Sequence, residues 1–296
     1  MVNRIATALV SSSLLFCFGG AAYAIDLGQE LKKAIEQTTQ PQTKSGPPQT
    51  NTGGGMITGG VGALLGISPE EEVAIGRQAA GNLLGAAPLV KDAALQKYVN
   101  NVGRWIASQS ERPDLAWHFG VIESNDINAF AAPGGYVFVT KGLYRMLQNE
   151  SELAGVLAHE VGHVIMKHHL KILQQSQLVD IGGKLLAKTA GENEQIKNLI
   201  GNGAEIFSRS LDKNAEYEAD RIAVILAARA GYDPFGLPTV LQDIGHASKD
   251  DSRVSLLFKT HPHPDDRLAQ LGEAVGDRLD RLKGQTLEKR FYRIKQ

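Results

Sequence analysis

Hydrophobic residues recur every three or four positions over several stretches of the chain, which is the spacing of an amphipathic helix. The first of these stretches opens with Ser68, Pro69 and Glu71, which are typical of an N-cap, a first helical position and a capping box. The pattern predicts helices over residues 69–84, 91–108, 153–169, 211–230 and 264–282, with two more between residues 170 and 207.

Two short stretches change to the pattern of strands. Trp117 to Ile122 and Tyr136 to Thr140 are rich in β-branched and aromatic residues, and Pro133-Gly134-Gly135 marks the turn into the second stretch. An exposed strand here would pair with an extended peptide by main-chain hydrogen bonds, without reading its sequence closely. The structural alternative is an ordinary sheet that only covers the helices, and the sequence alone leaves both interpretations open.

The first 24 residues have the layout of a secretory signal peptide. Arg4 precedes an apolar stretch over residues 5–22, and Ala22-Tyr23-Ala24 is a small-residue cleavage site. Such a signal directs export, and the expected location is the periplasm. Cleavage after Ala24 would remove the only cysteine, Cys17. Phe16 disfavours lipid attachment at the next residue. An uncleaved membrane anchor is the alternative.

The next 42 positions, residues 25–66, shift in composition to Gln, Thr, Pro and Gly. Such a segment buries too little apolar area to offset its chain entropy, so we expect a flexible arm here and a folded domain over residues 67–296. Past residue 24, no apolar run approaches the ~18–20 residues of a transmembrane helix, and we expect no span after signal cleavage. Charges nearly balance, with 31 basic and 32 acidic residues, so the composition does not favour a nucleic-acid partner.

The chain is organised around the run His159-Glu160-Val161-Gly162-His163. On a helix, histidines four positions apart lie one turn over the other, so both imidazoles reach one metal ion while Glu160 lies beside it. This spacing is typical of zinc proteases. The structural alternative is a buried helix whose histidines bond to the backbone or to carboxylates. His168 and His169 are rotated away from this face, and we expect them to lie in solvent.

Two carboxylates are expected on the buried face of the helix over residues 211–230. Extending its apolar stripe back by one and two turns reaches Asp220 and Glu216. Zinc bound by two histidines needs a third protein ligand, commonly a glutamate, and Glu216 would supply it. Asp220 would accept the far N–H of a ligating imidazole and fix its tautomer. The alternative for this pair is a structural salt bridge with Arg209 or Arg267.

At this point the chain resembles the zinc metallopeptidases of the HtpX and CAAX prenyl protease family. It is most similar to their soluble periplasmic branch, which includes the β-barrel-assembly-enhancing proteases. The resemblance covers roughly residues 68–282. It rests on four motifs, which are His159-Glu160-x-x-His163, Glu216-x-x-Ala219-Asp220, Asn128-Ala129-Phe130-Ala131-x-Pro133-Gly134-Gly135 and Thr260-His261-Pro262.

The resemblance implies one zinc ion per chain, bound by His159, His163 and Glu216, with Glu160 as the catalytic base. It also implies a mostly helical α+β domain of the gluzincin type, in which the edge strand of a small β-sheet lines the active-site cleft. Substrate would bind along the motif that runs from Asn128 to Gly135, at Asn128, Ala129, Phe130, Gly134 and Gly135.

His261 is the further candidate catalytic residue, because family members carry a His-Pro pair near the metal. It would either donate a hydrogen bond to the developing oxyanion or fill the open zinc position and hold the enzyme latent. His263 and Arg267 are expected to shape this loop and to cap the helix over residues 264–282.

These features predict a periplasmic zinc endopeptidase that hydrolyses unfolded or misassembled cell-envelope proteins. Its substrates would be polypeptides, and its partners would be envelope or outer-membrane assembly proteins. The alternative is a chaperone-like protein that keeps the zinc but cleaves little, although a pure binding module has no use for Glu160. We expect neither prenylated-protein processing nor docking through a repeat array, because hydrophobic spans are absent and the chain stops near residue 296.

Overall fold

The computed structural model describes residues 67–174, 211–247 and 251–294. The expected signal peptide, the arm over residues 25–66 and most of the region 170–207 lie outside the described residues. The described helices are α3 (Pro69–Ala86), α4 (Ala93–Ala107), α5 (Lys141–Met146), α6 (Glu150–Ile165), α9 (Lys213–Arg229), α10 (Gly236–Gly245), α11 (Ser255–Thr260) and α12 (Pro264–Val275). The strands are β1 (His118–Ile122), β2 (Ala129–Ala132) and β3 (Tyr136–Thr140), and the 3-10 helices are η2 (Ser252–Val254), η3 (Gly276–Arg281) and η4 (Glu288–Arg290).

Side-chain caps fix the starts of the helices. At α3 the predicted capping box is confirmed, since the Ser68 hydroxyl accepts the Glu71 N–H and the Glu71 carboxylate accepts the Ser68 N–H at 2.7 Å. Asn149 caps α6 by accepting the Glu152 N–H at 3.1 Å, while the Glu152 carboxylate accepts the Gln148 N–H at 2.6 Å. These local bonds begin α3 at the predicted residue and begin α6 at Glu150, three residues before the predicted start.

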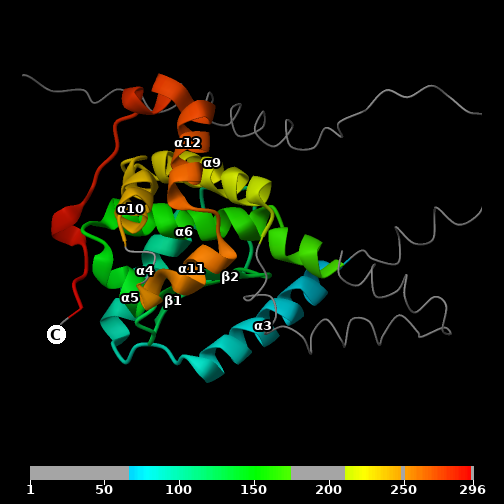
Figure 1. The fold of residues 1–296 in the computed structure, drawn as a ribbon. Coiled ribbons are helices and arrows are strands. Elements are labelled where there is room, and N and C mark those ends of the chain that lie inside the picture. Colours follow the sequence, from blue (N-terminus) through cyan, green and yellow to red (C-terminus); the bar gives the residue numbers. More distant parts are fainter. Residues whose placement is uncertain (1–66, 175–210, 248–250, 295–296) are drawn as a thin grey trace, which may run out of the picture. The chain divides into compact units, whose positions relative to one another are not determined.

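Helix α6 is buried along nearly its whole length, and α4, α9, α10 and β2 pack around it (Figure 1). Glycines let two of these neighbours come close. A Cβ added at Gly155 would lie 2.5 Å from the backbone nitrogen of Leu237 in α10, and one at Gly162 would lie 3.3 Å from the Cα of Ala219 in α9. The His-Glu-x-x-His run therefore lies in the centre of the packed helices.

The central helix ends four residues earlier than the sequence predicts. It stops at Ile165, and Lys167 adopts a left-handed φ of 57° that turns the chain before a new helical segment begins at His168. The predicted helix over 264–282 is also wrong in its extent, because Gly276 has a φ of 49° and the chain continues as the 3-10 helix η3. Both breaks occur at residues in the left-handed region, which ends an α-helix.

The sheet has the strand order β1-β3-β2, with β1 parallel and β2 antiparallel to β3. The two predicted strands are confirmed, and β2 was missed. Its sequence, Ala129-Phe130-Ala131-Ala132, lacks β-branched residues and runs directly into the Pro133 turn, so it does not resemble a strand. Because β2 has a partner on one side only, it is the edge of this sheet next to α6.

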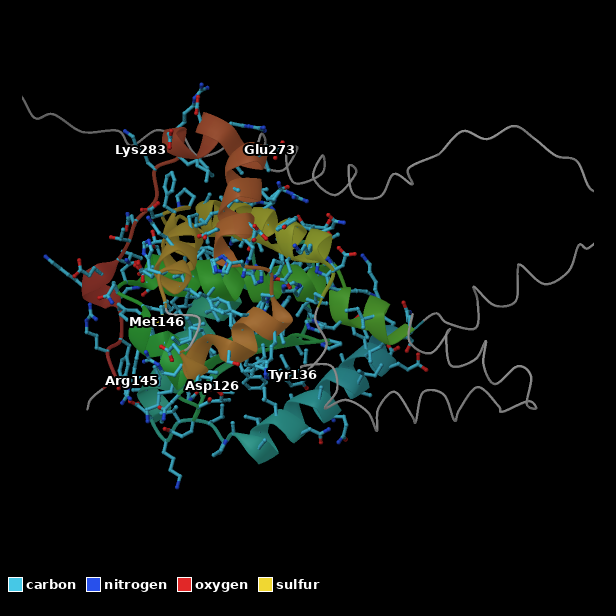
Figure 2. All side chains as sticks on the ribbon, in the orientation of Figure 1. Asp126, Tyr136, Arg145, Met146, Glu273 and Lys283 are labelled. Carbon is cyan, nitrogen blue, oxygen red and sulfur yellow. The ribbon has the colours of Figure 1, made fainter. Side chains whose placement is uncertain are left out.

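Side chains fill the space between the helices and the sheet, whereas charged residues such as Glu273 and Lys283 point outward (Figure 2). The mostly helical α+β fold class is confirmed. The sequence did not predict the short helices α5, α10 and α11. Among the described residues, no helix combines the length and the apolar character that crossing a membrane requires.

Glu72 ties α3 to the rest of the domain although it is only 1% exposed. Its Oε1 accepts hydrogen bonds from Arg112 Nη1 at 2.7 Å and from the Gly134 N–H at 3.2 Å, and its Oε2 lies 3.2 Å from Lys167 Nζ. One carboxylate thus joins α3, the turn between β2 and β3, and the turn after α6. Burial alone would raise the pKa of Glu72, but these donors outweigh burial and lower the pKa below its ordinary value.

We expect Glu72→Gln to lower the free energy of unfolding by about 1–3 kcal/mol at pH 7, because charge-assisted hydrogen bonds to a buried carboxylate are lost. A carboxylate with a lowered pKa in the folded state stabilises the protein above its unfolded pKa. The difference between the variant and the wild type should therefore shrink as the pH falls below about 4.5 and through the lowered pKa of Glu72. Urea titrations at several pH values measure this, with the exposed Glu70→Gln as control. A difference that stays constant down to pH 3 would contradict the assignment.

Candidate metal centre

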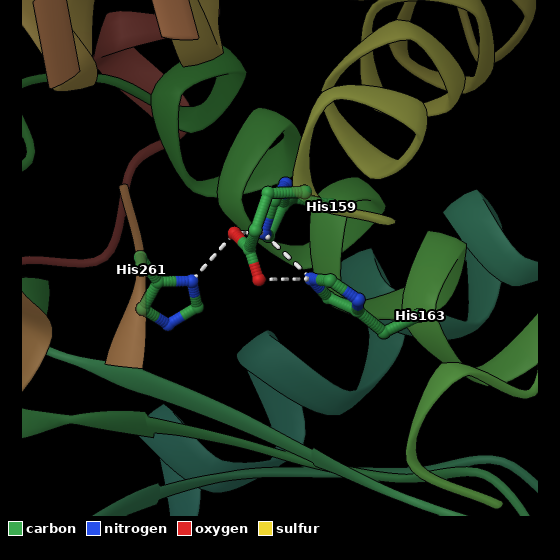
Figure 3. A group of neighbouring side chains, drawn as sticks. His159, His163 and His261 are labelled. Carbon is green, nitrogen blue, oxygen red and sulfur yellow. Dashed lines mark hydrogen bonds and ion pairs between the residues drawn. The ribbon is translucent and has the colours of Figure 1, made fainter. Parts of the chain in front are cut away.

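Helices α6 and α9 bring two histidines and a carboxylate together. His159 and His163 project from α6 with their Nε2 atoms 2.9 Å apart. Glu216 of α9 places Oε2 3.6 Å from His159 Nε2 and Oε1 3.5 Å from His163 Nε2. Together with His261, the imidazoles point at this one carboxylate (Figure 3). All four side chains offer a ligand atom within 4.8 Å of the others.

The donor set fits a divalent metal ion. Tetrahedral zinc with ligands at about 2.0–2.1 Å places its ligand atoms about 3.3 Å apart, close to the separations between Glu216 and the two histidines. Glu216 is fully buried, and its Oε1 has no hydrogen-bond partner among the described residues. Such an atom is costly unless a cation or a donor satisfies it. The arrangement therefore supports a candidate metal site.

Asp220 contacts His159 at the ring nitrogen that faces away from His163. Its Oδ1 lies 2.9 Å from His159 Nδ1, which leaves Nε2 of the ring to face His163 and Glu216. Arg267 also contacts Asp220, donating through Nε at 2.9 Å and through Nη2 at 2.5 Å. Asp220 therefore makes both of the contacts considered for it, since it bonds to the His159 imidazole and forms a salt bridge with Arg267. Burial opposes ionisation, but Arg267 and His159 lower the pKa of Asp220 well below its ordinary value.

Arg267 was expected to shape a loop and to cap α12. Instead it is 4% exposed and lies against the candidate metal centre, with Nη2 3.2 Å from His159 Nδ1. The cap of α12 comes from His263, whose Nδ1 accepts the Asp265 N–H at 3.3 Å, so this part of the expectation is confirmed. Arg209 lies outside the described residues.

The expectation that His168 and His169 lie in solvent is wrong. The left-handed turn at Lys167 carries the chain back toward α6, and His168 is only 4% exposed. His168 Nδ1 lies 2.9 Å from His163 Nδ1, and its Nε2 lies 3.0 Å from Oε2 of Glu218 in α9. His169 lines the pocket described below, and burial lowers its pKa to about 4. The expectation assumed that the helix continues to His169. Because α6 ends at Ile165, its helical period does not give the orientation of His168 or His169.

Glu160 lies in a pocket with His163, His261 and the strand β2. It is 4% exposed, and burial raises its pKa above the ordinary value although His159 and His261 oppose this. A raised pKa suits a carboxylate that takes and returns a proton. For the neighbouring His163, burial lowers the pKa and so keeps the imidazole ring neutral. The pocket thus pairs a base with side chains that suit a cation.

His261 follows α11 and turns its ring into the centre. Its Nδ1 lies 2.7 Å from Glu216 Oε2, and its ring centroid is 6.0 Å from that of His159. Burial alone would lower the pKa of His261, but the Glu216 carboxylate raises it. In turn, burial would raise the pKa of Glu216, but His261, His159 and Arg267 lower it to about 2. His261 therefore bonds to a candidate metal ligand in the described conformation.

One wall of the pocket is formed by Asn128, which directly precedes the edge strand β2, and by Ala129 and Phe130 of β2. Asn128 is 1% exposed, and its Nδ2 has no hydrogen-bond partner among the described residues. Gly134 and Gly135 lie at the turn into β3 with φ of 74° and 93°, and they are not among the residues that line the pocket. The structure thus brings the first three predicted substrate positions to the centre and places the two glycines at the turn.

Sequence reasoning missed the places of His168 and Glu218. For Arg267 it weighed the salt bridge with Asp220 but not the contact with His159. For Glu218 the helical period gave no signal, since two positions after Glu216 it is rotated by about 200° to the other face of α9. For His168 no local signal existed, since its position depends on a turn that ends α6 without a glycine or a proline.

The fold and the site define a helical metallopeptidase of the His-Glu-x-x-His class. The chain belongs to peptidase family M48, a family of metal-dependent proteases, whose model matches residues 93–275.

Several curated relatives share this region. The chain is 34% identical over 211 residues to the beta-barrel assembly-enhancing protease of Escherichia coli (strain K12), which covers 69% of this chain and 43% of the relative. It is 31% identical over 178 residues to the mitochondrial metalloendopeptidase OMA1 of Schizosaccharomyces pombe, covering 60% of this chain and 52% of the relative. It is 29% identical over 160 residues to the metalloprotease YcaL of Escherichia coli (strain K12), covering 53% and 62%. The chain spans less than half the length of the beta-barrel assembly-enhancing protease.

Proposed function

We propose that this chain is a zinc metalloendopeptidase that hydrolyses peptide bonds in extended polypeptide segments. The observation that carries the proposal is the buried cluster of His159, His163 and Glu216, beside the pocket that Glu160 lines. Within the described part of the chain, one Glu216 oxygen has no hydrogen-bond partner. Membership in peptidase family M48 supports it. In this proposal the domain over residues 67–296 is the peptidase.

Each side chain at the centre has a distinct role in the proposal. His159 and His163 bind one zinc ion through Nε2, and Glu216 binds it through a carboxylate oxygen. Asp220 keeps the proton of His159 on Nδ1, so that the Nε2 lone pair stays available. The donor set of two imidazoles and one glutamate is the set that catalytic zinc sites commonly use.

When bound, zinc would polarise the scissile carbonyl and lower the pKa of water to about 7. Glu160 then acts as the general base that removes a proton from the attacking water. It holds this proton while the bond to the carbonyl carbon forms, and it delivers the proton to the leaving amine. Its burial favours this cycle, because the raised pKa of Glu160 brings the acid and the base forms closer in energy near neutral pH.

The polypeptide would lie along β2, whose outer edge has no strand partner in the described sheet. An extended segment can pair there by main-chain hydrogen bonds, which requires no particular substrate sequence. Asn128 would add a donor, because its buried Nδ2 is in the pocket wall without a partner among the described residues. This mode of binding suits unfolded segments, since a folded protein has few free strands to offer.

We further propose that His261 fills the open metal position in the described conformation. Its Nδ1 is 2.7 Å from Glu216, and it belongs to the cluster whose ligand atoms lie within 4.8 Å of one another. An imidazole in that position excludes water and substrate, so the conformation is latent. Displacement of the short segment between α11 and α12 would open the site.

The cellular role that we propose is quality control of unfolded or misassembled proteins in the periplasm, in contact with outer-membrane assembly proteins. This role is supported by the signal-like pattern of residues 1–24 and by the similarity to proteins named beta-barrel assembly-enhancing protease. The alternative is a chaperone-like role without cleavage, and measurements of zinc content and casein cleavage test it.

We expect Glu160→Gln to keep one zinc ion per chain and to lower casein cleavage by about 100- to 10,000-fold, because the amide cannot take a proton from water. Metal content by mass spectrometry and cleavage rates of the same samples measure this. The matched control is Glu152→Gln, which changes another buried carboxylate of α6 away from the cluster. Measurable and equal cleavage by wild type and Glu160→Gln would refute the proposed base. A wild type that binds zinc but cleaves nothing would point to latency or to the chaperone-like role, and cleavage by His261→Ala would then identify latency.

We expect His261→Ala to raise the cleavage rate severalfold, because the open metal position becomes free for water and substrate. The control is His263→Ala, which removes a helix cap two residues further on. Cleavage rates with a fluorogenic peptide at saturating zinc measure both variants. A fall in rate for His261→Ala alone would show that His261 assists the reaction and does not block it.

A further inference from the structure

We propose that His168 and Glu218 form a second relay behind the metal centre, which fixes the tautomer and the ring orientation of His163 and so strengthens metal binding. The proposal rests on the proposed function, because it assigns His163 as a ligand through Nε2. His168 and Glu218 would not touch substrate or metal, and they are positioning residues. Their contribution should appear in the metal affinity.

The distances define a continuous chain of hydrogen bonds. His163 Nδ1 lies 2.9 Å from His168 Nδ1, and His168 Nε2 lies 3.0 Å from Glu218 Oε2. Both lengths are within the range of a good hydrogen bond. The rings of His163 and His168 are 5.1 Å apart and inclined at 69°, so an edge nitrogen of each ring can face the other.

One assumption determines which atom donates each hydrogen bond between His163, His168 and Glu218. If His163 presents the lone pair of Nε2 to a metal ion, its proton is on Nδ1 and donates to Nδ1 of His168. His168 then has its own proton on Nε2, which donates to the acceptor-only carboxylate of Glu218. The carboxylate thus selects the tautomer of His168, and His168 selects the tautomer of His163.

Burial makes this selection effective. His163, His168 and Glu218 are between 1% and 4% exposed, so bulk water does not compete for their polar atoms. A buried Nδ1–H without an acceptor would cost free energy, and rotation of the His163 ring would break its bond to His168. The relay therefore restrains the ring in the orientation that faces His159 and Glu216.

Glu218 and His168 come from different parts of the fold, the first from α9 and the second from the segment after α6. Glu218 follows Glu216 by two positions, a rotation of about 200° around α9, so it faces away from the cluster of candidate ligands. The left-handed turn at Lys167 returns the chain so that His168 lies between Glu218 and His163. Without this turn, α6 would continue and His168 would not reach either partner.

The two candidate histidine ligands are consequently supported in different ways. His159 contacts the Asp220 carboxylate directly, and Arg267 neutralises that carboxylate. On its Nδ1 side, His163 contacts a second imidazole, which in turn contacts a carboxylate. One helix, α9, provides a candidate ligand in Glu216 and the carboxylates behind both histidines. A purely structural His168–Glu218 pair is the alternative, and it would stabilise the fold without affecting metal affinity.

The test is a zinc competition titration of the full chain against a chromophoric chelator at fixed pH, combined with unfolding of the metal-free protein. We expect His168→Phe, which removes the acceptor, to weaken zinc binding by about 10- to 100-fold. His168→Asn places an amide oxygen near the position of Nδ1 and should recover part of this loss. Glu218→Gln keeps an acceptor without the charge and should have a smaller effect than His168→Phe. The control Glu152→Gln should bind zinc as the wild type does.

The outcomes separate this inference from the proposed function. If the wild type binds no zinc, the proposed function fails. If the wild type binds zinc and all His168 and Glu218 variants bind it equally well, the relay is refuted while the metal site stands. If His168→Phe does not fold, the comparison of Glu218→Gln and His168→Asn with the wild type still decides, and unchanged affinity in both would overturn the proposal.

Discussion

The close packing of α6 against α9 is the constraint on which the site depends. Gly162 leaves room for Ala219, so the two helices approach closely where His159 and His163 face Glu216. A larger separation would move the carboxylate out of reach of both imidazoles. Because each helix is rigid over this length, the positions of the side chains follow from the helix contact and need no ordering of a loop. The contrast is His261, which reaches the same carboxylate from a connection between two short helices.

Compensation of buried charge explains why so many residues around the centre are polar. Glu216, Glu218 and Asp220 are all buried on one helix, and each is near a different group: His261 for the first, His168 for the second, Arg267 for the third. Carboxylates in such a place are tolerated only when partners replace the lost water. The arrangement costs stability at the centre and restricts each imidazole to one tautomer. The apolar contacts of α6 with α4 and α10 offset that cost.

Much of this site could be predicted from the sequence, because its key residues lie on helices whose period is fixed. The spacing of His159 and His163, and the extension of the α9 stripe to Glu216 and Asp220, depend only on 3.6 residues per turn. What could not be predicted depends on long-range packing. The turn that buries His168 follows from a single left-handed residue, and the burial of Arg267 follows from the docking of α12. Strand β2 exists because β3 pairs with it, although its own residues have little strand preference.

The central claim is that α6 and α9 hold a metal ion through His159, His163 and Glu216. Zinc K-edge X-ray absorption of the purified zinc-loaded protein tests it most directly, since it reports the ligand types and their distances. The account predicts four nitrogen or oxygen ligands at about 2.0–2.1 Å, with outer-shell scattering from three imidazoles in the wild type and from two in His261→Ala. A spectrum with oxygen ligands alone, or one that keeps the scattering of three imidazoles in a His163→Ala variant, would contradict the claim.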